Sequence, residues 1–189
     1  MKRIINPFVY LGGGRALAWG LAGLAAASVI ATRLGLTFRG VVSLGYGDWP
    51  LWKTALAQLL VWGIFATLLY LCGLVLSKSR IRAVDVYGTN LFARLPFIGV
   101  MLLAALPGIR AYTDSLLGMT FTQAEAMIPP VSVIFFALVV LFVLVWYFVW
   151  TYNGYVVSTN LGKGRAAVSF IVCYILSEVF SALVWNLIF

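Results

Sequence analysis

Few side chains in this sequence are of the types that do acid–base or metal chemistry. Histidine, the commonest general base and metal ligand, is absent. The acidic residues are spread along the chain, with no two of them three or four positions apart: Asp48, Asp85, Asp114, Glu125 and Glu178. Cys72 and Cys173 each lie within an apolar run, which is typical of small core residues. We therefore expect a protein that is not an enzyme and that holds no cofactor and no metal.

Glu178 is the acidic residue that falls well inside an apolar run. An ionisable group at that depth in a membrane is costly, so it is a candidate functional group. Small side chains beside it recur every four residues, as suits close packing against another helix: Ser169, Cys173, Ser177 and Ser181. Two interpretations stay open. Glu178 is either a proton- or cation-binding carboxylate, or a polar clasp to Gln58, Thr67 or an interfacial arginine.

Two polar segments between apolar runs hold the remaining candidates for binding. In the first they are Lys78, Arg80, Arg82, Asp85, Tyr87, Gly88 and Arg94, and in the second Asn153, Gly154, Tyr155, Lys163 and Arg165. We expect both segments to be loops at one membrane face, with Gly88 and Gly154 in tight turns. Asp85 is a candidate ion-pair partner of Arg94 or Arg165. Such loops would bind a partner protein or lipid headgroups. The alternative is that they are interfacial re-entry turns whose cations serve membrane topology and contact anionic lipid headgroups.

The composition predicts that lipid surrounds much of the chain. Of the 189 residues, 63% are hydrophobic and 10% are charged, whereas an ordinary soluble domain has about 25% charged residues. The net charge of +8 comes from Lys and Arg between apolar runs, without the interleaved aromatic residues of a nucleic-acid-binding surface. We therefore expect an integral membrane protein of one domain, residues 1–189, that binds no nucleic acid.

Five apolar stretches approach the roughly 20 residues that a helix needs to cross the hydrocarbon core. The expected fold is an all-α bundle of five transmembrane helices, with spans at about residues 16–32, 51–76, 95–109, 131–152 and 166–189. The third is the shortest, with a proline near each end, so it must thin the bilayer, let its arginines snorkel to the interface, or begin earlier, near Leu91. Asn153-Gly154 is expected to end the fourth. Residues 122–125 fit a capping box, which predicts a short interfacial helix there.

The positions of Lys and Arg predict the orientation of the bundle. With a cytoplasmic N-terminus, the inner segments hold Lys2, Arg3, Arg15, Lys78, Arg80, Arg82, Arg94, Lys163 and Arg165, and the outer ones hold Arg33, Arg39, Lys53 and Arg110. This imbalance favours an N-in/C-out topology. A cleavable signal peptide ending near Ala25-Ala-Ala27 is the alternative for the first span. The apolar run that continues to Arg33 favours a retained helix.

Short motifs over nearly the whole chain carry a family resemblance. Asp85-Val-Tyr-Gly88 is similar to the Asp-Leu-Tyr-Gly-Pro signature of the Ypt/Rab-interacting (Yip) family, with Thr89 in place of the proline. Further segments resemble bacterial members of that family: Ile5-Asn-Pro-Phe8, Ser77-Lys-Ser-Arg-Ile-Arg82, Ala93-Arg-Leu-Pro96, Tyr152-Asn-Gly-Tyr155 with Asn160-Leu, and Ser169-Phe-Ile.

The resemblance implies a five-span protein with a cytoplasmic N-terminus in the bacterial inner membrane. Eukaryotic members bind prenylated Rab-type GTPases and one another, but a long cytoplasmic region precedes their signature, where this chain has two spans. We therefore expect a non-enzymatic scaffold or adaptor that contacts a different protein partner, a second copy of itself, or anionic headgroups. The alternatives are a small transporter or channel subunit that uses Glu178 and, third, a lipid-handling enzyme.

Overall fold

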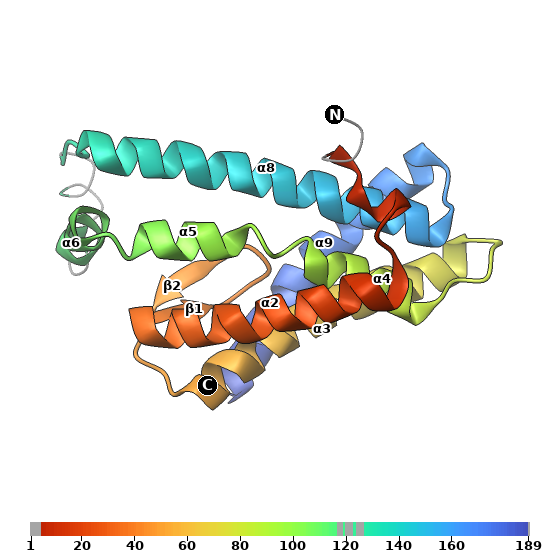
Figure 1. The fold of residues 1–189 in the computed structure, drawn as a ribbon, viewed down its shortest axis with the longest axis horizontal. Helices are drawn as coiled ribbons and strands as arrows, with labels where there is room; N and C mark the ends of the chain where they lie inside the picture. The colour runs from red at the N-terminus through yellow and green to blue at the C-terminus, as the bar shows by residue number, and fades with distance from the viewer. Residues whose placement is uncertain (1–4, 117–118, 120–122, 124–126, 189) are drawn as a thin grey trace.

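The chain folds as a bundle of helices, five of which are long and apolar enough to cross a membrane (Figure 1). The computed structural model describes residues 5–116, 119, 123 and 127–188. Within these residues the five spans are α2 (Gly13–Leu34), α3 (Leu51–Leu76), the segment Ala83–Ala104, α8 (Val131–Thr159) and α9 (Lys163–Ile188). A short 3-10 helix, η1 (Pro7–Val9), precedes them. The structure thus has the predicted number of helices long and apolar enough to cross a membrane, and the second has the predicted bounds.

The third span begins earlier than the sequence predicts. Instead of residues 95–109 it covers Ala83–Ala104, as α4 (Ala83–Phe92) followed by α5 (Phe97–Ala104). A separate helix, α6 (Pro107–Leu116), follows with a proline in its first turn, where no backbone donor is needed. Over the third span 56% of the residues are buried, the largest share among the five. The polar side chains of the third span therefore face protein. They lower the hydropathy of the segment, which is why the sequence suggests a loop there, but the segment is helical.

The fourth span continues past the point where Asn153-Gly154 is predicted to end it. Helix α8 runs to Thr159 and ends at Asn160, whose φ of 52° places it in the left-handed region. Gly154 lies within the helix, at a close contact with α4. A Cβ there would lie 2.8 Å from the Cβ of Thr89 in α4. The glycine thus permits α8 and α4 to approach closely.

Helix α4 is held between α2 and α8, and α2 is its most extensive neighbour (Figure 1). A Cβ at Gly88 would lie 2.8 Å from two backbone atoms of α2, the carbonyl oxygen of Gly13 and the amide nitrogen of Leu17. From the other side, a Cβ at Gly20 would lie 2.8 Å from the side chain of Leu91. Small residues on both helices thus bring the backbones together, as in other membrane helix pairs.

A two-stranded hairpin lies among the helices, so the prediction of an all-α protein is wrong in this respect. Strand β1 (Leu36–Phe38) pairs antiparallel with β2 (Leu44–Tyr46), with Phe38 opposite Leu44. The hairpin lies between α5 and the pair α2–α3 (Figure 1), and Gly40 and Val41 at its tip are buried. Non-helical backbone is tolerated within a membrane protein where protein surrounds it.

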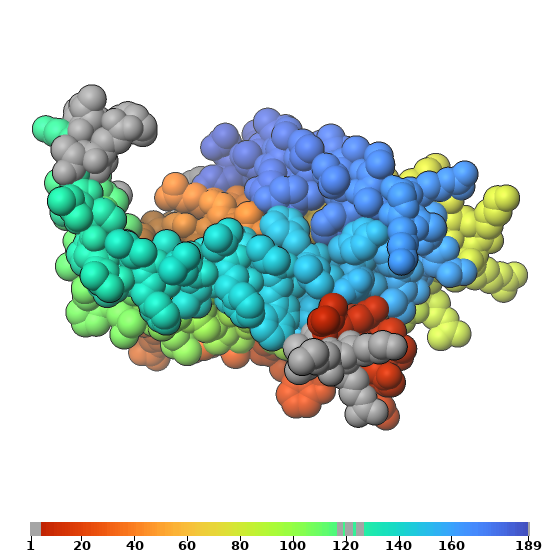
Figure 2. Space-filling view, turned by 90° about the horizontal axis from the view of Figure 1, so that it is seen from above, coloured from red at the N-terminus to blue at the C-terminus, as the bar shows by residue number. Residues whose placement is uncertain are grey.

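Helix α8 forms one edge of the molecule. The space-filling view shows it extended across this face, with α9 beside its second half (Figure 2). Only 6% of the residues in its most apolar stretch are buried, against 22% to 56% in the corresponding stretches of the other spans. Most of α8 is therefore available to lipid. Of the interfacial helix predicted at residues 122–125, Gln123 is described and is helical, and the other three residues lie outside the described part of the chain.

Candidate functional site

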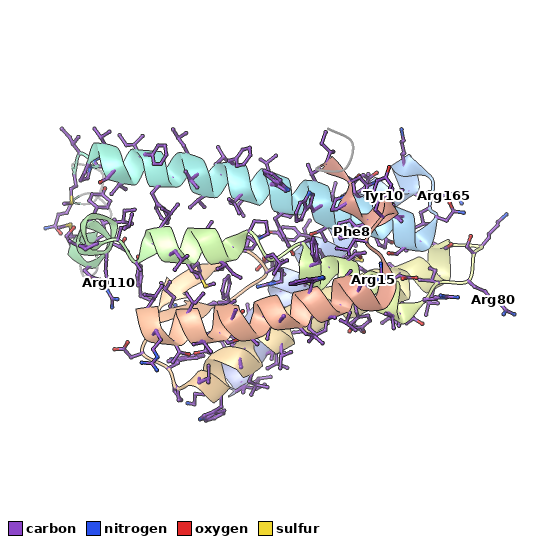
Figure 3. The ribbon with its side chains drawn as sticks, in the orientation of Figure 1. Phe8, Tyr10, Arg15, Arg80, Arg110 and Arg165 are labelled. Carbon is purple, nitrogen blue, oxygen red and sulfur yellow. The ribbon has the colours of Figure 1, made fainter. Side chains whose placement is uncertain are left out.

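Exposed cations from three separate segments gather at one end of the bundle, which we call the basic end. They are Arg15, Lys78, Arg80, Arg82, Lys163 and Arg165. They come from the first turn of α2, the α3–α4 connection and the first turn of α9. Arg15, Arg80 and Arg165 lie at the same end of the molecule in Figure 3, whereas Arg110 lies at the opposite end.

Hydrogen bonds join the two polar segments that contribute most of these cations. The Ser77 hydroxyl donates to the carbonyl oxygen of Thr159 at 2.6 Å. The Asn160 amide donates to the Ser79 hydroxyl at 3.4 Å. Across the α8–α9 turn, the Tyr152 hydroxyl donates to the carbonyl oxygen of Lys163 at 3.1 Å. The α3–α4 connection and the start of α9 thus form one continuous surface.

Several residues predicted to lie on binding loops are helix-packing residues instead. The Tyr87 hydroxyl is 2.7 Å from the Thr67 hydroxyl on α3, and that of Tyr155 is 3.0 Å from the Ser169 hydroxyl on α9. Gly88 and Gly154 are buried at the helix contacts described above. The reason is that both motifs are helical, so every third or fourth residue turns towards a neighbouring helix.

Asp85 and Asn153 both lie close to the N-terminal part of the chain. Asp85 does not pair with Arg94 or Arg165; a Cβ at Gly13 would lie 3.0 Å from its carboxylate. A negative charge beside the N-terminus of α2 is favourable because of the helix dipole. The Asn153 amide donates to the carbonyl oxygen of Ile5 at 3.0 Å. Both side chains therefore have structural contacts beyond any role in binding.

Arg94 is buried in the middle of the bundle rather than exposed on a loop, so the prediction that it contacts an external partner is wrong. Only 9% of its surface is exposed. One guanidinium nitrogen, Nη1, donates to the carbonyl oxygen of Val41 at 3.3 Å, and the guanidinium carbon lies 5.3 Å from the centre of the Phe38 ring. The other nitrogen, Nη2, has no hydrogen-bond partner. Arg94 thus binds the hairpin tip from the third span.

Glu178 approaches the same hairpin tip from α9. Its carboxylate occupies the space that a side chain at Gly40 would need, and one of its oxygens, Oε1, is buried without a hydrogen-bond partner. The guanidinium of Arg94 interacts electrostatically with both Glu178 and the buried Tyr147 of α8. We call Arg94, Tyr147 and Glu178 the polar centre.

The partners expected for a Glu178 clasp have other contacts. Gln58 donates its amide hydrogen to the Ser28 hydroxyl at 3.2 Å, a bond between α3 and α2, and Thr67 bonds Tyr87. The arginine that interacts with Glu178 is Arg94, from the middle of the third span. Glu178 therefore interacts with Arg94 and, one helical turn away on α9, with Tyr174, rather than with Gln58 or Thr67.

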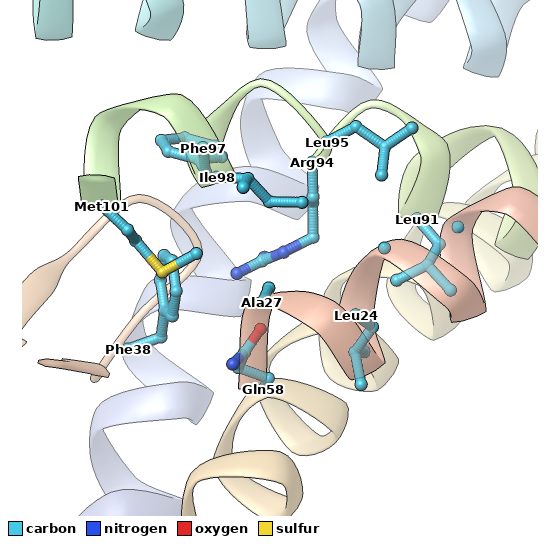
Figure 4. Close-up of a pocket in the computed structure, with 12 residues that line it drawn as sticks. Leu24, Ala27, Phe38, Gln58, Leu91, Arg94, Leu95, Phe97, Ile98 and Met101 are labelled. Atoms are coloured by element: carbon cyan, nitrogen blue, oxygen red, sulfur yellow. The ribbon is translucent and has the colours of Figure 1, made fainter. Parts of the chain in front are cut away.

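The polar centre has little free volume around it. Arg94 and Gln58 line a cavity of about 20 Å³ beside α2 (Figure 4), and one water molecule needs roughly 10–15 Å³ of such volume. Opposite charges from the third span and α9 interact across the hairpin tip, and each offsets part of the other's burial penalty. This arrangement can hold the hairpin in place.

The described residues include no group of three or more His, Cys, Asp or Glu side chains that could hold a metal ion. No family model, no curated protein and no solved structure matches the chain. What the fold defines is a class: an integral membrane protein with five apolar helices long enough to span a membrane, a hairpin packed among them, and exposed cations concentrated at one end. The resemblance to the Yip family stays a prediction.

Sequence reasoning missed Tyr147 and the hairpin tip as components of the polar centre. Tyr147 lies among other aromatic residues on a helix with a strongly apolar sequence, so nothing local distinguishes it. A signal for Arg94 was present, since apolar residues flank it on both sides. A cation in such a run is typical of a buried charge as well as of a helix boundary.

Proposed function

We propose that this chain is a non-enzymatic membrane scaffold or adaptor whose basic end binds a protein partner at the cytoplasmic surface. The observation that carries the proposal is the convergence of exposed cations from three segments at one end of the bundle. Asp85 is the acidic residue described near that end, and its carboxylate lies against the start of α2. The basic end therefore presents a net positive charge, which favours an acidic protein surface or anionic headgroups.

We infer an N-in/C-out topology in the bacterial inner membrane, in keeping with the Yip-type motifs. Six exposed cations lie at the basic end, and cytoplasmic segments carry the excess of Lys and Arg in such proteins. Arg94 is buried, so it no longer counts among the inner cations that indicate topology. The inner segments still hold more Lys and Arg than the outer ones. The small residues of α2, α4 and α8 described above face neighbouring helices of the bundle. The lipid-facing side of α8 is therefore the surface that a second copy of the chain or lipid would contact.

A cysteine-labelling experiment tests the orientation. In a background without the native cysteines, an impermeant thiol reagent added to intact cells should label Asp48→Cys but not Ser79→Cys. Both positions are exposed, at opposite ends of the bundle. Labelling of Ser79→Cys from outside would refute the proposal, because the basic end would then face away from the cytoplasm.

Crosslinking in native membranes tests the adaptor role. Charge reversal at Arg80 and Arg82 should abolish the specific crosslinked partners that the unaltered chain recovers. Arg33→Glu is the matched control, because it reverses an exposed cation at the other end. Equal loss with both variants, or no loss with either, would count against binding through the basic end.

A small transporter or channel subunit is the second candidate. The observation in its favour is the unpartnered carboxylate oxygen of Glu178 in the polar centre. The cavity of about 20 Å³ beside Arg94 is too small to form a path for a hydrated ion, which is why the adaptor is preferred. Proton flux into liposomes that contain the chain, compared with Glu178→Gln, distinguishes the two: flux that needs the carboxylate would favour the transporter.

A further inference from the structure

Helices α8 and α9 form an apolar groove that opens to the outside of the bundle near the basic end. The groove has a volume of about 390 Å³, within the roughly 300–1,000 Å³ of small-molecule sites. Its lining residues are all apolar or aromatic: Phe148, Val149, Tyr152, Ala167, Phe170, Ile171 and Tyr174. The two helices lie side by side in the space-filling view (Figure 2).

Aromatic rings give this groove a built surface. The Phe148 and Tyr174 rings are 5.0 Å apart and nearly perpendicular, and the Tyr152 and Phe170 rings are 5.8 Å apart in a similar arrangement. Such edge-to-face pairs hold each other in place. The surface is therefore preformed, as expected for a site that binds a flexible apolar chain.

A cation lies at the end of the groove. Lys163 is exposed and four residues before Ala167, so the two side chains share one face of α9. The Tyr152 hydroxyl, at the same end, donates to the carbonyl oxygen of Lys163 and ties that residue to the groove. The first turn of α9 contains no acidic residue, so the positive end of the helix dipole adds to the charge of Lys163.

The length of the groove matches one leaflet of a bilayer. From Lys163 to Tyr174 the helix rises about 16 Å, and half of the hydrocarbon core is roughly 15 Å thick. A ligand that fits this surface has an anionic group at the level of Lys163 and an apolar chain that extends towards the middle of the membrane. A phospholipid has this shape and this distribution of charge.

A second apolar groove, which has no cation near it, provides a comparison for the α8–α9 groove. It lies between α3 and α9, has a similar volume of about 420 Å³, and is also apolar. No Lys or Arg lies within one helical turn of its lining residues, which fall in 59–68 and 180–184. Generic lipid contact is expected at both grooves, but selection of an anionic lipid is expected only between α8 and α9.

We propose that the α8–α9 groove binds one acyl chain of an anionic phospholipid, and that Lys163 binds the phosphate of that lipid. The inference rests on the proposed function in one respect, because it assigns the basic end to a surface that carries anionic headgroups. The inference adds a defined lipid site that includes Lys163. Lipid binding at this site is separate from recognition of a protein partner elsewhere on the basic end.

Photolabelling of the full chain tests the site. The chain is placed in phosphatidylcholine nanodiscs that contain a trace of phosphatidylglycerol with a photoactivatable acyl chain, and labelled peptides are mapped by mass spectrometry. Label should concentrate in residues 148–152 and 167–174. Unlabelled phosphatidylglycerol should displace it, whereas inorganic phosphate should not, since the acyl chain supplies part of the binding.

Matched variants separate the cation from the groove. Lys163→Gln should reduce labelling about fivefold, the equivalent of about 1 kcal/mol for one cation near an anionic membrane surface. Arg33→Gln removes one exposed cation at the opposite end of the bundle and should leave labelling unchanged. Ala167→Trp should block the groove with Lys163 intact. Gly63→Trp, at the α3–α9 groove, should have no effect, because nothing lies within 4 Å of a Cβ there.

The outcomes are distinct. Equal labelling of Lys163→Gln and the unaltered chain, equal labelling of both grooves, or displacement by inorganic phosphate would each overturn the proposal. Size-exclusion profiles of the variants show whether each is still folded. Nanodisc labelling depends neither on a protein partner nor on orientation in the cell, so it can fail while the adaptor role holds, and the reverse.

Discussion

Arg94 and Glu178 approach the hairpin tip from different helices, so loss of Arg94 should destabilise the whole bundle. Replacement by Met keeps most of the side-chain volume and removes the charge. The bond from Nη1 to the Val41 carbonyl oxygen is lost, and a bond to a charged donor contributes about 1.5–3 kcal/mol. The half-buried Glu178 carboxylate also loses its electrostatic attraction to Arg94, which adds to the cost of the lost hydrogen bond.

We therefore expect Arg94→Met to lower the free energy of unfolding by about 3 kcal/mol. For a chain of this size, that corresponds to a fall in Tm of roughly 6–12 °C. The measurement is thermal unfolding in detergent micelles, followed by the loss of the monodisperse peak in size-exclusion chromatography. Arg80→Met, which removes an exposed cation, is the matched control and should change Tm by less than about 2 °C.

The double variant provides the critical result. Glu178→Gln in the Arg94→Met background removes the unbalanced carboxylate, so part of the lost stability should return, since an apolar or neutral replacement of both charges is often nearly neutral. Strictly additive effects of the two single changes would refute the reasoning, because residues that interact show a coupling term in such a cycle. So would an Arg94→Met variant as stable as the unaltered chain.

Three further predictions concern helix packing. Gly88→Ala should destabilise the bundle by about 1–3 kcal/mol, since its Cβ would meet the backbone of α2. Gly99→Ala, in open space on α5, should instead raise stability by up to about 1 kcal/mol. Equal effects of the two changes in thermal unfolding would contradict this. Gly40→Ala should destabilise the chain by displacing the Glu178 carboxylate, and a Glu178→Ala background should abolish that effect. Tyr155→Phe should cost about 1 kcal/mol in the same assay through the lost bond to Ser169; a variant as stable as the unaltered chain would contradict this.

Hydropathy alone determined the number of spans and the bounds of α3. The reason is that the lipid-facing surface of a helix must be apolar whatever its neighbours are, so the signal is local to each stretch. Span number also determined that the α3–α4 and α8–α9 connections lie at the same end, because the two spans between them, the third and the fourth, return the chain to its starting side. The cations of both connections are found together as a result.

Tertiary contacts alone decided the third span, the hairpin and the polar centre. Helix α4 is surrounded by α2, α3 and α8, so its Asp and Asn side chains face protein rather than lipid, although the segment resembles a loop in sequence. The residues that meet at the hairpin tip come from positions 40–41, 94, 147 and 178, and no local pattern relates them. Hydropathy reports what a residue would face in lipid, whereas burial of these groups depends on which other helix covers them.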